Sequence, residues 1–399
     1  MGKYDFDTVI DRRGSGAVKT DRLEALYGRD DLMALWIADM DFPVCPEIIQ
    51  AMRSRLEHPL FGYSWAPDSF WQSIIDWERR RHSIDFCRED LTFVPGVVKG
   101  VSYAVNYFTR EGDGVVIQPP VYHPFRITIE GNRRRLLQNP LIPVDGGYEM
   151  DFEGLEALIA REHPKMMVLC NPHNPGGVAW SPDVLRRVAS ICRAAGMIVV
   201  SDEIHADLML WGRHHHPFVS VSPDAEAVGI TLGAPSKTFN IPGFVSSWIA
   251  IKNPALRHGF YEWMEANQFS EPTFTATVAA EAAYTLGEPW LDEMLSYIQD
   301  TIVEVERFVD NEMPGVKVMR PDASFLLWLD FRTLGLPQQR LVDIMVNEGH
   351  LALNDGTMYG AQGEGFLRLN IASPRSVIME AMHRMKRAFA PYLQPVECV

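Results

Sequence analysis

The 399-residue sequence has no run of about 18 apolar residues, the length that a membrane-spanning helix needs. Its first residues, MGKYDFDTVIDRRG, lack the apolar stretch of a secretory signal peptide, so we expect none. Positive charge is also scarce, because 37 Lys and Arg stand against 52 Asp and Glu, a net charge of −15. These absences argue against a membrane or nucleic-acid partner and predict a cytoplasmic protein.

Cysteine is rare as well, and its five positions form no CxxC pair: Cys45, Cys87, Cys170, Cys192 and Cys398. An odd, scattered set predicts reduced core thiols and excludes a disulfide framework or a zinc site. The run 214–216 holds three consecutive histidines, which cannot converge on one metal ion from a strand or a helix. We interpret this run as a loop packed near a cleft and predict no metal.

A hydrophobic content of 47% is ample for a core, and apolar runs alternate with helical patterns between residues 91 and 285. Ser181 and Pro182 have the residue types of a helix N-cap and first turn. The pattern predicts an α/β fold with a mainly parallel sheet covered by helices on both faces. The predicted strands are 91–94, 114–119, 165–171, 196–203, 227–233 and 245–251.

The C-terminal part has a different pattern, in which an amphipathic helix at 288–313 precedes apolar strands and two further helices, near 337–347 and from 374. We therefore expect two structural units. The large one comprises residues 46–285, and a smaller α+β unit combines 286–399 with an N-terminal arm at 1–45. A ligand cleft should lie between them, at the carboxyl ends of the parallel strands.

Polar side chains that follow the predicted strands form a short list of candidate site residues. The strands are followed by Asn174, by Asp202 with His205, and by Ser236 with Lys237. The helix that begins near Gly96 would present free backbone amides to a phosphate. The remaining candidates are Val97, Val98, Lys99, Tyr122 and Arg368.

These residue types suit pyridoxal 5′-phosphate acting on an amino acid. A lysine such as Lys237 is most often a surface residue, but burial lowers an ammonium pKa and favours the neutral amine that a Schiff base requires. An aspartate opposite keeps a heteroaromatic nitrogen protonated, which makes the ring an electron sink. An asparagine can bond the ring oxygen, an aromatic ring can stack on its face, and an arginine binds a carboxylate.

The segments NPHNP at 171–175, SDE at 201–203, Ser236-Lys237 and Arg368 resemble, in order and spacing, the class I aminotransferase superfamily of fold-type-I pyridoxal-phosphate enzymes. The resemblance covers nearly the whole chain. It implies a Schiff base on Lys237, a pyridine-nitrogen contact from Asp202 and a ring-oxygen contact from Asn174. It further implies that Tyr122 stacks on the ring, that Ser236 and the 97–99 amides bind phosphate, and that Arg368 binds the substrate carboxylate. Tyr63 resembles the tyrosine that reaches the neighbouring subunit's phosphate, which implies a homodimer.

At two positions this sequence differs from the superfamily pattern, and these differences indicate a particular branch of the superfamily. The superfamily pattern has an arginine where this chain has Val245, and a tyrosine where it has His205. Together with WIADMDF at 36–42, these changes resemble the cystathionine β-lyase or C–S lyase branch. That branch implies β-elimination of S-substituted cysteines to thiol, pyruvate and ammonia, with Trp36 near the substrate. Aminotransfer is the alternative, since both reactions use the same lysine.

Several residues also have simpler interpretations. Tyr122, Trp36 and His205 could be core side chains, and Asp39 with Asp41 would hold a turn. The segment 12–20 resembles a phosphate loop only superficially, because no strand precedes its glycines. A regulatory protein that lost its chemistry is a third hypothesis, which the retention of Lys237 and its partners disfavours.

Overall fold

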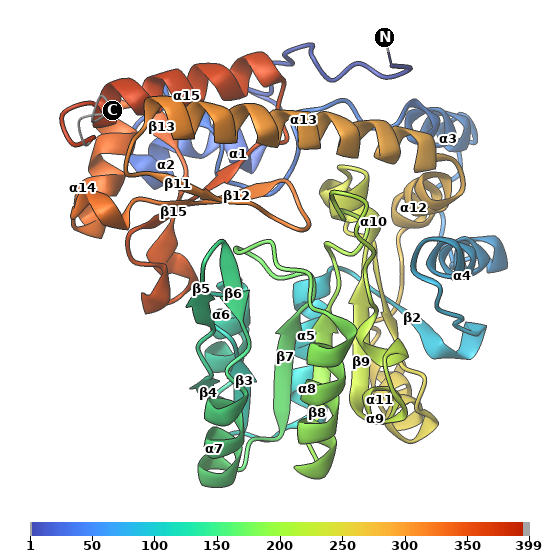
Figure 1. The fold of residues 1–399 in the computed structure, drawn as a ribbon. Coiled ribbons are helices and arrows are strands. Elements are labelled where there is room, and N and C mark those ends of the chain that lie inside the picture. The colour runs from blue at the N-terminus through green and yellow to red at the C-terminus, as the bar shows by residue number, and fades with distance from the viewer. Residues whose placement is uncertain (1, 394–399) are drawn as a thin grey trace.

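The computed structural model describes residues 2–393, which form a seven-stranded sheet in the lower half of Figure 1 and a four-stranded sheet above it. The strand order of the large sheet is β2-β10-β9-β8-β7-β3-β4. Its strands are β2 (Leu91–Val94), β3 (Gly114–Ile117), β4 (Arg135–Gln138), β7 (Met166–Cys170), β8 (Ile198–Asp202), β9 (Gly229–Gly233) and β10 (Ser247–Ala250). All six predicted apolar runs form strands of this sheet, and four of them, β3, β7, β8 and β9, pair in parallel.

The predicted mainly parallel sheet is confirmed, and the sixth run is its exception, because β10 is antiparallel to both of its neighbours, β2 and β9. The connection from β9 to β10 contains only the four-residue helix α10 (Pro235–Thr238) and one 3₁₀ turn. So short a connection does not cross the sheet, and the chain re-enters it from the edge at which β9 ended. An apolar strand pattern carries no information about this direction.

Helices cover both faces of the large sheet, as expected. Successive strand residues point to opposite faces, so that Val116 and Met167 belong to one buried cluster and Val115 and Met166 to the other. One cluster includes α7 (Phe152–Glu162), α8 (Pro182–Ala194) and α9 (Pro223–Val228), and the other includes α5 (Val97–Phe108), α6 (Pro124–Gly131) and α11 (Pro254–Ala266). Ser181 caps α8 by accepting a hydrogen bond from the Val184 amide.

The small sheet is antiparallel and has the order β11-β12-β15-β14. Its strands are β11 (Lys317–Met319), β12 (Leu326–Asp330), β14 (Asn354–Asp355) and β15 (Phe366–Asn370). Helices α13 (Glu288–Glu312) and α15 (Arg375–Phe389) cross the top of Figure 1 beside one another. Near the predicted helix at 337–347, α14 (Gln338–Asp343) continues into a π-helical turn, Ile344–Glu348.

The N-terminal segment joins this upper part of the molecule. β1 (Met33–Ala34) pairs in parallel with β13 (Leu351–Ala352), which supports the predicted grouping of residues 1–45 with 286–399. The domain limits themselves stay a prediction. The remaining elements are α1 (Val18–Asp21), α2 (Leu23–Tyr27), α3 (Pro46–Glu57), α4 (Asp68–His82), α12 (Phe274–Leu286), β5 (Ile142–Val144) and β6 (Gly147–Glu149).

The structure tests two further predictions, that the cysteines are buried thiols and that no helix spans a membrane. Cys45, Cys170 and Cys192 are free and buried, but Cys87 is exposed, so it is no core thiol. Cys398 lies outside the described residues. Within residues 2–393, no helix has the length and apolar character that crossing a membrane requires.

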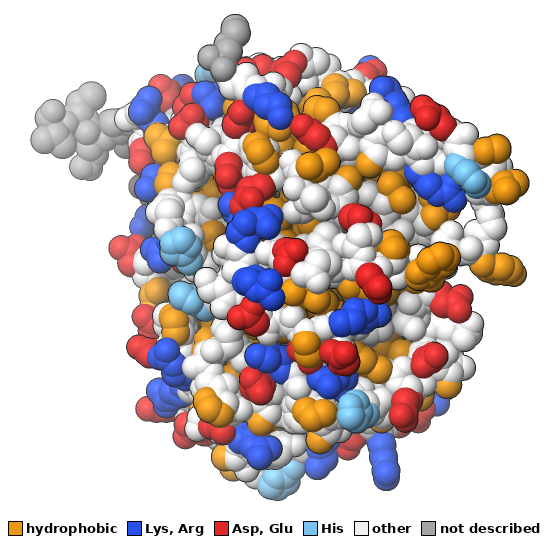
Figure 2. Space-filling model, turned by 90° about the vertical axis from the view of Figure 1, so that its right-hand side faces the viewer, with side chains coloured by type: hydrophobic (Ala, Val, Ile, Leu, Met, Phe, Trp, Pro, Cys, Tyr) orange, Lys and Arg blue, Asp and Glu red, His pale blue; other side chains and the backbone are white. Residues whose placement is uncertain are grey.

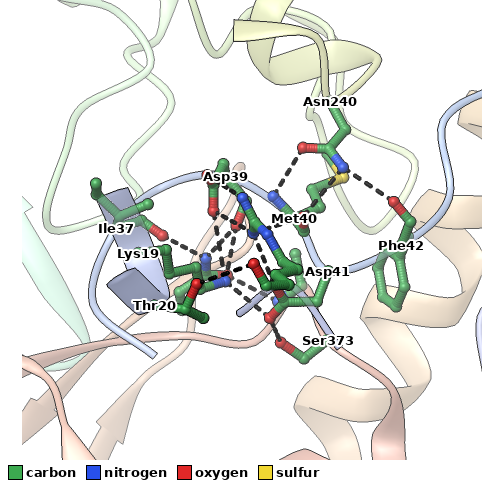
Figure 3. Close-up of polar contacts among 12 residues, drawn as sticks. Lys19, Thr20, Ile37, Asp39, Met40, Asp41, Phe42, Asn240 and Ser373 are labelled. Atoms are coloured by element: carbon green, nitrogen blue, oxygen red, sulfur yellow. Dashed lines mark hydrogen bonds and ion pairs between the residues drawn. The ribbon is translucent and has the colours of Figure 1, made fainter. Parts of the chain in front are cut away.

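A buried ion network fixes the segment at 37–42 (Figure 3). Lys19 is 1% exposed, and its Nζ lies 2.8 Å from Asp41 Oδ2 and 3.5 Å from Asp39 Oδ1. Arg12 pairs with the same two aspartates, at 2.9 Å from Asp39 and 2.8 Å from Asp41. The segment that resembled a phosphate loop is therefore an ordered arm, and both aspartates have the structural role that we expected.

A second buried polar cluster lies behind α10 and centres on Asp207. Its carboxylate accepts hydrogen bonds from His82 (2.8 Å), Trp77 (2.8 Å) and Thr238 (2.7 Å). Although burial opposes it, the charges of Glu78 and Asp207 raise the pKa of His82 to about 9. The cluster therefore ties α4 to the residue that follows Lys237.

We expect Asp207→Asn to lower the free energy of unfolding by about 3 kcal/mol, because a protonated, buried His82 would lose its anionic partner. Urea unfolding monitored by circular dichroism measures this change. Asp310→Asn, at an exposed position on α13, is the control and should be nearly neutral. Equal stabilities of the two variants would contradict the assigned role of Asp207.

Candidate active site

A cavity of about 270 Å³ lies where the parallel strands of the large sheet end. Its wall contains most of the predicted site residues: Val97, Val98, Lys99, Tyr122, Asn174, Asp202, His205, Ser236 and Lys237. Carboxyl ends of parallel strands meet at one edge of a sheet, which is why residues so distant in sequence converge.

Strand register explains this convergence. Cys170, the last residue of β7, lies opposite Asp202, the last residue of β8, and Asp202 in turn lies opposite Leu232 of β9. Asn174 follows β7 by four residues, and Lys237 follows β9 by four residues on α10. Each side chain therefore leaves the sheet at nearly the same height.

Lys237 is reached from the cavity and is otherwise surrounded by protein. Burial lowers its pKa to about 8, and the nearby positive charge of Arg368 acts in the same direction. Its Nζ donates a hydrogen bond to the backbone carbonyl of Ala38. An amine with this pKa is neutral in a substantial fraction of molecules at neutral pH, as a nucleophile or a general base requires.

Asp202 and His205 are both buried, each with 3% exposure. Burial raises the pKa of Asp202 to about 7, and only one hydrogen bond, from the Ile204 amide at 3.1 Å, favours its charged form. Burial, assisted by Lys237 and Arg368, lowers the pKa of His205 to about 3, so this imidazole is neutral. The Nδ1 atom of His205 is buried and has no partner among the described residues.

The N-terminus of α5 lies at another wall of the cavity. Gly96 precedes it with φ +113°, a conformation that residues with side chains rarely adopt, and it lines the cavity together with the first three residues of the helix. The first amides of a helix have no partner within the helix, so those of Val97, Val98 and Lys99 can bind an anion. Val245 lies opposite in the left-handed region, with φ 54°.

Arg368 lies beside the cavity on β15 and is 4% exposed. Its Nη1 donates to Asn174 Oδ1 at 3.1 Å, and its Nη2 donates to Asn354 Oδ1 at 2.6 Å and to the Trp36 carbonyl at 2.8 Å. Its Nε is buried without a partner. The guanidinium is thus held from both sheets, and Nε–H and one Nη1–H remain available.

Two predicted site residues do not reach the cavity in this chain. The Trp36 indole donates to the Lys19 carbonyl at 3.0 Å and packs against Tyr27, so its ring belongs to the packing of the N-terminal segment. Tyr63 is fully exposed. His215 is buried against Glu203 at 2.8 Å, and residues 2–393 contain no metal-holding cluster.

Sequence reasoning missed several wall residues, including Ala38, Pro95, Cys170, Ile204 and Ser247. These residues are small or apolar, and their types carry no chemical signal. Asn354, which holds Arg368, was also missed, because it lies on a two-residue strand far from any motif.

Comparisons with known proteins place the chain in a family. The model of the family "aminotransferase class I and II" matches residues 30–385. Cystathionine beta-lyase PatB of Bacillus subtilis (strain 168) is 42% identical over 97% of this chain and 100% of its own length.

Solved structures agree with this comparison. Cystalysin from Treponema denticola, which contains pyridoxal 5′-phosphate, has a TM-score of 0.94 and 33% identity, over 97% of this chain and 99% of its own. The PLP-bound C–S lyase from Staphylococcus hominis has a TM-score of 0.90 and 30% identity, over 96% of this chain and 98% of its own. This chain belongs to the aminotransferase class I and II family, among relatives that include carbon–sulfur lyases.

Proposed function

We propose that this chain is a pyridoxal-phosphate-dependent carbon–sulfur lyase, which cleaves S-substituted cysteines to a thiol, pyruvate and ammonia. The observation that carries the proposal is the position of Lys237, with its lowered pKa, in one cavity with Asp202 and beside Arg368. Relatives named for this chemistry cover nearly the whole chain.

The residues present fit pyridoxal phosphate. Lys237 would carry the cofactor, and Asp202 would hold the ring-nitrogen proton, since a cation at that point compensates a buried carboxylate that lacks an ion-pair partner. The unpartnered Nδ1 of His205 and the amide of Asn174 would face the ring oxygen, and Tyr122 would cover one face of the ring.

The phosphate would bind to the amides of Val97, Val98 and Lys99 and to Ser236. Lys99 and Lys237 are the cationic side chains that line this cavity, so Lys99 is the source of positive charge where the superfamily arginine is replaced by Val245.

When bound, the cofactor supplies an electron sink for the bond that breaks at Cα. Arg368 holds the substrate carboxylate and thereby fixes the position of the Cα–H bond. The amine of Lys237, free once the substrate amine has replaced it on the cofactor, would then remove the Cα proton and retain it in the cavity. Loss of a thiolate from Cβ follows, whereas an aminotransferase would return this proton to the cofactor carbon.

We further propose a homodimer in which Tyr63 completes the partner's site. In this chain Tyr63 (108%), Trp65 (78%), Leu60 (69%) and Phe61 (56%) are exposed on one extended segment. Figure 2, which views the side of the molecule on the right of Figure 1, shows hydrophobic side chains that stand out from the surface. A cluster of this kind is typical of a protein interface.

The first prediction from this function concerns turnover. With L-cystathionine and no 2-oxo acid, the holoenzyme should release pyruvate and homocysteine over many turnovers. Lys237→Ala should lower the rate by about a thousandfold or more, because the other amine that lines the cavity, that of Lys99, is assigned to the phosphate and not to the Cα proton. Lys165→Ala, at the opposite edge of the sheet, is the control. A single turnover that resumes only when a 2-oxo acid is added would instead show an aminotransferase.

The second prediction concerns pH. The pKa of Asp202, about 7 in the folded chain against 3.8 in an unfolded one, makes the cofactor-free protein lose stability as the pH rises from about 4 to 7. Relative to Asp202→Asn, the wild type should lose about 2–3 kcal/mol of unfolding free energy between pH 5 and 7. Urea unfolding measures this difference. Bound cofactor should abolish it, and a difference that does not vary with pH would contradict the assignment.

The third prediction tests the shared site by complementation. Tyr63→Ala and Lys237→Ala chains should each be nearly inactive alone. Unfolded and refolded together, they should recover about a quarter of wild-type activity, because half of the dimers are mixed and each has one intact site. Native mass spectrometry confirms mixing. Mixed dimers without activity would rule out a contribution of Tyr63 across the interface.

A further inference from the structure

A second recess adjoins the cofactor cavity and contains polar groups without partners. It has a volume of about 20 Å³, enough for one water molecule, and shares Tyr122 with the cavity. Its wall combines α6 with the 3₁₀ turn Gly356–Tyr359: Tyr122, His123 and Arg126 face Met358, Tyr359 and Gly360. None of the described residues that line it is acidic.

The polar atoms of this recess are unsatisfied. Tyr359 is 2% exposed, and its hydroxyl has no hydrogen-bond partner among residues 2–393. The Nδ1 atom of His123 is buried and also lacks one. Buried polar atoms normally have a protein or water partner, so these two are available to a polar group that enters the recess.

Two arginines, Arg368 beside the cavity and Arg126 in the wall of the recess, place positive charge near these atoms. The Arg368 guanidinium lies 5.2 Å from the Tyr359 ring centre, and that ring lies edge-on to His123 at 6.0 Å. Burial is the main cause that lowers the pKa of His123 to about 4, and the positive charges of Arg368 and Arg126 lower it further. The His123 imidazole is therefore neutral. Arg126 is exposed at the rim, and within residues 2–393 its guanidinium forms no ion pair.

Under the proposed function, Arg126, His123 and Tyr359 would lie near the bound substrate. A substrate whose carboxylate is bound by Arg368 lies near Tyr359, because the centre of that ring is 5.2 Å from the guanidinium. Tyr359 lines the recess, and Tyr122 lines both the recess and the cavity, so the recess adjoins the space that the substrate would fill. An unpaired arginine and neutral N–H and O–H donors recognise an anion with hydrogen-bond acceptors, of which a carboxylate is the commonest on amino acids.

We propose that Arg126, His123 and Tyr359 form a subsite for a carboxylate on the leaving group. This inference rests on the proposed function and narrows its substrate class. The preferred substrates are S-substituted cysteines whose sulfur substituent ends in an acid, as in thioethers or disulfides that join two amino acids, over those with neutral S-alkyl groups.

The test compares two substrates of the holoenzyme, L-cystathionine and the neutral S-propyl-L-cysteine. The ratio of their kcat/KM values should fall about tenfold in Arg126→Gln, mainly through the KM of L-cystathionine, and further in Arg126→Glu. His123→Phe, which keeps the ring packing but loses the N–H donor, should lower the ratio in the same direction. Arg110→Gln, an arginine at the opposite edge of the sheet, should leave the ratio unchanged.

Calorimetry gives a second readout that does not depend on turnover. In L,L-2,7-diaminosuberate a carbon replaces the sulfur of L-cystathionine, so this analogue binds without cleavage, and L-2-aminooctanoate is its neutral counterpart. The ratio of their dissociation constants should shift by a similar factor in Arg126→Gln. Ratios that do not change in either experiment overturn the subsite. If wild type cleaves neither thioether, the proposed lyase function fails, and the calorimetric ratio alone decides the subsite.

Discussion

The pairing of Lys19 with Asp39 and Asp41 is the interaction on which the rest of the site depends. A buried ion network of this kind adds little net stability, but it fixes one arrangement of the chain. The segment that it fixes offers its backbone carbonyls to the site: that of Ala38 accepts a bond from Lys237, and those of its neighbours accept bonds from residues of β15. Local order in the N-terminal arm therefore determines where the reactive amine lies.

Two buried aspartates show how the same residue type serves opposite purposes. Asp207 has three hydrogen-bond donors, so its charge is compensated within the protein. Asp202 has one backbone donor and no ion-pair partner among the described residues, and burial raises its pKa to about 7 although the charge of Lys237 opposes this shift. The first carboxylate is satisfied by the fold, whereas the second is poorly satisfied and lines a cavity. This difference cannot be seen in the sequence, in which Asp202 ends β8 and Asp207 follows it five residues later.

The sequence was sufficient for the parallel strands, the helices that cover them and the side chains at their carboxyl ends, because apolar periodicity and strand ends leave local signals. It failed where the outcome depended on long-range geometry. The direction of β10 followed from a short connection, and the Trp36 ring turned toward Lys19 because a backbone carbonyl was available there. Contributions from Asn354 and Ala38 depend on backbone position and small size, which leave no pattern.

Arg368 is held by Asn174 from the large sheet and by Asn354 and the Trp36 carbonyl from the other part of the molecule. A shift of either part would change the direction of the remaining N–H groups before it changed the shape of the cavity. The direction of this guanidinium is thus a property of the whole chain. A change in an exposed loop leaves these three contacts intact, whereas a change that moves the two sheets apart removes at least one of them.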